Sequence, residues 1–234
     1  MQSRSSAREG VYTRTDIRGG AHEGVYTETD ICTGAHGGVH VEAEVRTGTQ
    51  RCGACLSQPP AFDATIAAAD YVPPVDQLVL ALKFAGRLAL APLCARLLRD
   101  AVLSDARPQQ PRQSLPTLLL AVPLGEGRLA ARGFNQALEI ARPLSRSLGI
   151  ELQARLALRD RETVAQSLLH PDERQHNMRG AFGLCAGADV RGRHIGVVDD
   201  VITTGATLQE MALLLKRHGA ARVTNLVFAR TLPK

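Results

Sequence analysis

Residues 195–207 read Ile-Gly-Val-Val-Asp-Asp-Val-Ile-Thr-Thr-Gly-Ala-Thr, and this stretch decides the fold. Small and β-branched residues run without polar alternation into two adjacent carboxylates, a pattern typical of a strand buried on both faces of a parallel sheet. A Thr/Gly loop follows, and then an amphipathic helix over residues 207–218. We expect Asp199 and Asp200 at the carboxyl end of the strand, where such sheets bind ligands, with Asp200 facing solvent.

The loop after the acidic pair has the composition of a phosphate-binding turn. Backbone N–H groups at the start of a helix lack intrahelical partners, and the helix dipole favours an anion there. A glycine in the loop lets the backbone approach a phosphate without an intervening Cβ. The neighbouring carboxylates suit hydroxyls or a metal ion, so a ribose 5-phosphate fits both ends. The phosphate-binding candidates are Thr203, Thr204, Gly205, Ala206 and Thr207. The alternative is an ordinary buried strand with an Asp-capped turn.

The segment Val197–Thr207 resembles the signature with which type I phosphoribosyltransferases bind 5-phosphoribosyl 1-diphosphate (PRPP). The resemblance implies that Asp199 and Asp200 meet the ribose 2′- and 3′-hydroxyls, while residues 203–207 hold the 5′-phosphate. It also implies that Mg²⁺ bridges the diphosphate. No general base is identifiable, so the catalytic residues stay unknown at this stage.

Two further segments resemble the ComF (competence protein F) family. Leu82–Arg87 is similar to its K-[FY]-x-G motif, and Val122–Gln136 to its V-P-[VL]…R…R-G-[FY]-N-Q motif. Residues 125–133 are expected to form a loop in which Arg128 and Arg132 could grip a diphosphate bidentately. Lys83 is a further candidate, unless it is only a surface charge beside a helix-ending glycine. Gly125–Gly127 departs from the family, which is more basic there.

Residues 151–182 show no core periodicity, and their polar residues resemble the family's T-x-x-Q-x-x-L…R-x-x-N-x-x-G-x-F pattern. The resemblance implies a flexible hood that closes over the substrate and excludes water. Its candidate contact residues are Gln166, Arg174 and Asn177. The alternative is a surface loop that is polar only for solubility. In all, the likeness to ComF proteins covers residues 51–232.

The first 50 residues contain a tandem repeat with a period of 14, visible at residues 10–17 and 24–31 and degraded at 38–45. Because the repeats carry few large apolar side chains, we expect residues 1–50 to form a disordered extension. Residues 51–61 resemble the remnant of a zinc-finger region and serve as a linker. Cys52 and Cys55 supply two zinc ligands where a structural site needs four, so we expect no complete zinc site.

Composition limits the partners and the compartment. The net charge is +5, with −2 in residues 1–50 and +7 in residues 51–234. A basic body fits a phosphate-rich substrate or nucleic acid, or merely a solvated surface. No apolar window is long enough to predict a transmembrane helix, and the odd count of five cysteines favours a reducing, cytoplasmic setting.

Together these patterns predict an α/β fold over residues 62–234, of the type I phosphoribosyltransferase class, with a doubly wound, mostly parallel sheet flanked by helices. The resemblance implies a protein that binds PRPP and Mg²⁺ and transfers a phosphoribosyl group to an unidentified acceptor. The alternative is a non-catalytic competence accessory protein that binds nucleotide, single-stranded DNA or competence proteins. A homodimer stays open. Further strands are expected at residues 64–72, 118–124 and 222–229, and further helices at 75–84, 87–103 and 135–148.

Overall fold

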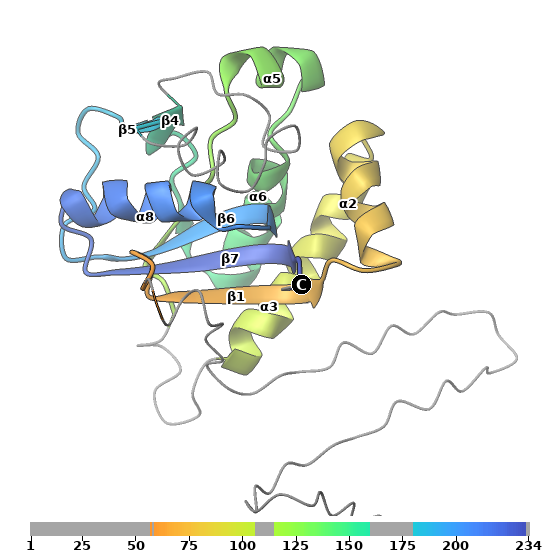
Figure 1. Cartoon of the computed structure of the whole chain (residues 1–234), viewed down its shortest axis with the longest axis horizontal. Coiled ribbons are helices and arrows are strands. Elements are labelled where there is room, and N and C mark those ends of the chain that lie inside the picture. Colours follow the sequence, from red (N-terminus) through yellow and green to blue (C-terminus); the bar gives the residue numbers. More distant parts are fainter. Residues whose placement is uncertain (1–56, 58, 106–114, 160–179, 233–234) are drawn as a thin grey trace, which may run out of the picture. The chain divides into compact units, whose positions relative to one another are not determined.

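The computed structural model describes residues 57, 59–105, 115–159 and 180–232. Within these ranges, five parallel strands form the main sheet in the order β1-β7-β6-β2-β3. Figure 1 shows β1, β7 and β6 side by side. The central strand is β6, which lies between β7 and β2. The strands are β1 (Ala64–Asp70), β2 (Leu118–Ala121), β3 (Glu151–Leu152), β6 (His194–Ile202) and β7 (Arg222–Arg230).

Helices cover both faces of this sheet. On one face α2 (Val75–Phe84), α3 (Ala91–Asp105) and α6 (Gln136–Leu148) pack on the even-numbered core residues of β6 and β7, such as Val198 and Phe228. On the other, α8 (Ala206–Arg217) and the antiparallel pair β4 (Ala157–Arg159) and β5 (Phe182–Leu184) pack on odd-numbered ones, such as Val197 and Val227. Since neighbouring strand residues face opposite sides, burial on both faces explains why β6 lacks polar alternation.

The predicted α/β class is confirmed, and most expected elements appear. The helix over residues 75–84 is α2, and the helix after the Thr/Gly loop is α8. The second predicted helix is divided into a 3₁₀ turn, η1 (Leu88–Leu90), followed by α3. No helix in the described ranges is both long and apolar enough to span a membrane.

Two expectations about loops are wrong. Residues 125–133 contain a helix, α5 (Glu126–Arg132), which ends at Gly133 with φ +81°. Its acidic first turn and basic last turn suit the helix dipole, but the segment is too short to show an apolar period. Residues 151–182 hold β3, β4 and the start of β5, short strands that were not expected.

A glycine in β6 is required by close packing. A Cβ on Gly196 would lie 2.5 Å from Leu119 Cδ2 and 2.9 Å from Pro116 Cγ. These distances are shorter than normal carbon contacts, so a larger residue would force the side chain of Leu119 to move. This close packing fixes β6 beside β2, and the carboxyl ends of these two strands carry the site.

Candidate functional site

The site lies at the carboxyl edge of the sheet, where β6 and β2 end side by side. Ala121 pairs with Val198, and the backbone N–H of Val122 donates to the Val198 carbonyl at 2.9 Å. The chain leaves β6 toward α8 and leaves β2 toward α5 at this edge. The candidates from residues 199–207 and from residues 128–132 therefore come from neighbouring connections, as a parallel sheet with this strand order requires.

Asp199 and Asp200 are adjacent acidic residues near the carboxyl end of β6. The Asp199 Oδ1 accepts from the Asp200 N–H, and the Asp200 Oδ1 accepts from the Val201 N–H, both at 2.8 Å. Each carboxylate thus uses one oxygen to hold the backbone at the strand end.

The expectation that Asp200 faces solvent is wrong. The residue is 3% exposed, and its Oδ2 lies 2.8 Å from the Nζ of Lys83 in the last turn of α2. Although Lys83 was a sequence candidate, the pattern gave no sign that it pairs with Asp200. A buried carboxylate needs such a counter-charge, because an unpaired charge is costly away from water.

The carboxyl group of Asp199 has a raised pKa. Burial, with the adjacent Asp200 carboxylate as the second cause, raises the pKa of Asp199 to about 8, against the opposing effect of Lys83. Two close carboxyl groups with a single lysine partner cannot both ionise readily. At neutral pH Asp199 therefore tends to keep its proton and can donate a hydrogen bond, while Asp200 is paired with Lys83.

The Thr/Gly loop leads directly into α8. Thr203 and Thr204 are exposed, and Gly205 is the N-cap residue with φ +78°, a conformation that favours glycine. Only Ile202 Cδ1, at 3.7 Å, lies near the position of a Gly205 Cβ. The positive φ, more than close packing within the protein, therefore requires glycine here. Glycine also has no side-chain oxygen with which to cap the first turn of α8.

The arginine candidates lie on α5, beside the end of α2. A pocket of about 470 Å³ separates the two helices, and Arg132 Cζ lies 5.6 Å from the centre of the Phe84 ring. Arg132 Nη1 also donates to the Gln136 Oε1. The pocket is lined by Lys83, Phe84, Ala85, Gly86, Arg128, Ala131, Arg132 and Phe134. The cations from the K-[FY]-x-G and R-G-[FY]-N-Q segments therefore face the same pocket.

One residue of the R-G-[FY]-N-Q segment has a supporting role that was not predicted. Asn135 Oδ1 accepts from the N–H groups of Ala137 (3.0 Å) and Leu138 (3.4 Å), and its Nδ2 donates to the Val122 carbonyl at 2.9 Å. Asn135 thus caps α6 and ties it to the end of β2. An asparagine directly before an amphipathic helix is the signal that could have predicted this cap.

Several candidates lie outside the described residues: Gln166, Arg174, Asn177, Cys52 and Cys55. The strands on either side of residues 160–179 are paired, since Arg159 of β4 is opposite Phe182 of β5 and its guanidinium lies 5.4 Å from that ring. In the described ranges, no three His, Cys, Asp or Glu side chains gather as a metal cluster would require.

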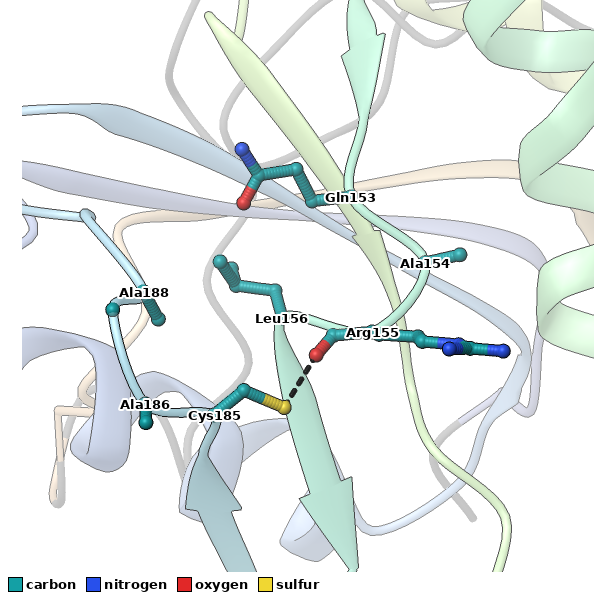
Figure 2. A pocket seen from close by; sticks show the side chains of 8 residues that line it. Gln153, Ala154, Arg155, Leu156, Cys185, Ala186 and Ala188 are labelled. Carbon is teal, nitrogen blue, oxygen red and sulfur yellow. Dashed lines mark hydrogen bonds between the residues drawn. The ribbon is translucent and has the colours of Figure 1, made fainter.

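A second pocket, of about 460 Å³, lies where the chain leaves β3 and β5 (Figure 2). It is lined by residues 153–156 and 185–188, none of which is a predicted site residue. The Cys185 thiol donates to the Arg155 carbonyl, and the Arg155 side chain points away from Cys185. We therefore assign no ligand to this pocket.

The sequence of this chain is similar to that of a known domain family and of two curated proteins. Residues 135–232 match the phosphoribosyl transferase domain. The DNA utilization protein YhgH of Escherichia coli strain K12 is 40% identical over 181 residues, 77% of this chain and 78% of that protein. Competence protein F of Haemophilus influenzae is 35% identical over 175 residues, 74% of this chain and 76% of that protein. The chain belongs to the ComF family, within the type I phosphoribosyltransferase superfamily.

A solved structure, the hypoxanthine phosphoribosyl transferase of Trypanosoma cruzi, aligns with 63% of this ComF-family chain and 76% of its own length, at 12% identity and a TM-score of 0.39. The ComF relatives have names that refer to DNA utilization and competence. The matched domain begins at residue 135, so it includes the acidic pair and the loop before α8.

Proposed function

We propose that this ComF-family protein binds PRPP and handles its phosphoribosyl group. The observation that carries the proposal is the arrangement at the end of β6: two carboxyl groups followed by a loop that enters α8 through a glycine N-cap. The membership of the chain in a family with a phosphoribosyl transferase domain supports it. The proposed domain spans residues 62–234, with 51–61 as a linker.

In this proposal the 5′-phosphate lies on the N–H groups of residues 203–207. These groups and the α8 dipole favour an anion, and the exposed hydroxyls of Thr203 and Thr204 add donors. The ribose hydroxyls meet Asp199 and Asp200. A protonated Asp199 donates to one hydroxyl, and Asp200, which is paired with Lys83, accepts from another.

The diphosphate extends toward the pocket between α2 and α5. Lys83, Arg128 and Arg132 line that pocket, and guanidinium groups bind phosphate oxygens bidentately. Mg²⁺ suits carboxylate and phosphate oxygens, so the acidic pair is where a Mg²⁺ carried by the diphosphate would find protein oxygens. When bound, the ion neutralises charge on the diphosphate as the bond to the ribose weakens.

A transfer reaction also needs an acceptor. We expect the hood, residues 163–182, to close over the bound substrate and exclude water.

The cytoplasm suits this activity, because the free thiols Cys94 and Cys185 stay reduced there. Burial raises the pKa of Cys94 to about 12, so this thiol remains protonated.

Calorimetric titration of the full chain with PRPP, with and without Mg²⁺, tests the proposal. Binding that Mg²⁺ strengthens, together with separate binding of inorganic phosphate, is the expected result. Failure of PRPP to bind at millimolar concentration would reject it. Incubation with PRPP and a panel of nucleobases, followed by measurement of released diphosphate, then tests transfer.

A further inference from the structure

Both carboxylate oxygens of Asp200 already have partners. Oδ1 accepts from the Val201 N–H, and Oδ2 lies 2.8 Å from the Nζ of Lys83. Because Asp200 is only 3% exposed, a ligand hydroxyl that binds it has to take the place of one of these partners. The N–H of Val201 is fixed in the backbone of β6, whereas Lys83 is a flexible side chain with 24% of its surface exposed. Lys83 is therefore the partner that a ligand displaces.

The displacement of Lys83 has a cost that a hydroxyl alone does not offset. When one partner of a buried ion pair is removed, the other charge is left uncompensated, which is strongly destabilising. A hydroxyl replaces the hydrogen bond to Asp200, but it gives the ammonium group of Lys83 no counter-charge. A ligand that opens this ion pair must therefore also bring an anion for the lysine.

The pocket between α2 and α5 offers a place for that anion. Lys83 is one of the residues that line the pocket, so its ammonium group can turn toward an anion there while the last turn of α2 stays in place. None of the eight lining residues is acidic. In the function proposed above, the diphosphate of PRPP extends into this pocket, and the Mg²⁺ that it carries offsets the charge of Asp200. PRPP therefore supplies new partners for both members of the ion pair.

We propose that Lys83 is a specificity-determining residue, which makes the site select a ribose 5-phosphate that carries a second anionic group at C1 over ribose 5-phosphate itself. This inference rests on the proposed function and names the residue that distinguishes the whole ligand from a fragment of it. With PRPP, Lys83 exchanges the carboxylate of Asp200 for the diphosphate. With ribose 5-phosphate no anion receives the lysine, so the ion pair stays closed and Asp200 does not contact the ribose.

Calorimetric titration of the full chain with PRPP and with ribose 5-phosphate, each in the presence of Mg²⁺, tests the proposal. In Lys83→Met we expect the ratio of the two affinities to fall by about 10- to 150-fold, the range for one hydrogen bond to a charged group. The affinity for ribose 5-phosphate should not fall. Lys216→Met is the matched control, because Lys216 pairs with Asp63 at 2.7 Å and its side chain is 29% exposed. It should keep the wild-type ratio.

A second background keeps the test decisive if Lys83→Met, which leaves the carboxylate of Asp200 unpaired, does not fold. In Asp200→Asn the carboxylate is absent, and a lysine that only anchors α2 to it has no further effect. Adding Lys83→Met to Asp200→Asn should still weaken PRPP by about 10-fold or more and leave ribose 5-phosphate unchanged.

Two results would overturn the proposal. One is an unchanged affinity ratio when Lys83→Met is added to Asp200→Asn, and the other is equal weakening of both ligands by Lys83→Met. In either case PRPP still binds the wild type, so the proposed function stands. If PRPP does not bind the wild type at all, the proposed function and this inference are both wrong.

Discussion

Two helices begin near the carboxyl edge of the sheet, and their first turns are built in opposite ways. The first turn of α6 is capped by Asn135, whose Oδ1 accepts from two backbone N–H groups. The start of α8 has Gly205, with φ +78° and no side chain that could cap. One helix therefore has its first N–H groups bound by the side chain of its N-cap residue, and the other begins without a side-chain cap.

The difference bears on the phosphate site that we propose at the start of α8. Asn135 also donates to the Val122 carbonyl, so it acts as a structural tie between β2 and α6. The start of α8 instead follows an acidic pair and two exposed threonines. A helix dipole is present in both cases, so the dipole alone does not define a site. The N-cap residue is what distinguishes the two helix starts.

The largest expected effect comes from Gly205→Val. A β-branched residue strongly disfavours a φ near +78°, so the loop must change shape and we expect phosphate and PRPP affinity to fall by about 100-fold or more. Gly149→Val is the matched control, since Gly149 has φ +67° at the far end of α6 with no neighbouring atom within 4 Å of an added Cβ. It should lower stability but leave phosphate binding unchanged, as calorimetry can check. Equal loss of binding in both variants would contradict the comparison.

Asp200→Asn should come next. The change removes a charged acceptor for a ribose hydroxyl, so PRPP affinity should fall by about 10- to 150-fold while inorganic phosphate binds as before. The thermal midpoint should also fall, because Lys83 loses its carboxylate partner. Titration of the variant with PRPP and with phosphate checks this. Unchanged affinity for both ligands would remove the ribose assignment.

Asp199→Asn should change the pH dependence of stability. Since the pKa of Asp199 is raised to about 8 in the folded chain, the folded state holds a proton that the unfolded state releases near 3.8, the ordinary pKa of an aspartate. The stabilisation from this carboxyl is complete below that value and is lost as the pH rises toward 8. The Asn variant should therefore gain stability relative to the wild type between pH 4 and pH 8, measured by urea unfolding. A constant difference across this range would contradict the raised pKa.

The smallest effect should come from Asn135→Ala. Loss of an N-cap costs roughly 0.5–2 kcal/mol, so the free energy of unfolding should fall by that amount. Asn135→Asp keeps the capping oxygens and loses only the donor to Val122, so its loss should be smaller. Phosphate affinity should not change in either variant. A loss of phosphate binding would mean that the start of α6 also contributes to the site.

The local elements of the fold were predictable, whereas contacts between distant segments were not. The apolar run of β6, its acidic pair and the glycine before α8 are continuous in sequence, and each leaves a pattern that physical rules can interpret. The short strand β3 contains two residues and shows no period. Lys83 pairs with Asp200 across a large part of the chain, and no spacing rule predicts such a contact. For the same reason the burial of Asp200 was missed.

The lysine at the end of α2 belongs to two neighbourhoods. Its Nζ pairs with Asp200, and the next residue along the chain is Phe84, on the same last turn of α2. A ligand that competes for Asp200 would act on the anchor of this turn, and a ligand in the pocket that Lys83 and Phe84 line would act on the same anchor. If the ligand at Asp200 changes the affinity of the ligand in the pocket by some factor, the ligand in the pocket must change the affinity at Asp200 by the same factor. Through this ion pair, α2 would connect the end of β6 with the pocket that Lys83 and Phe84 line.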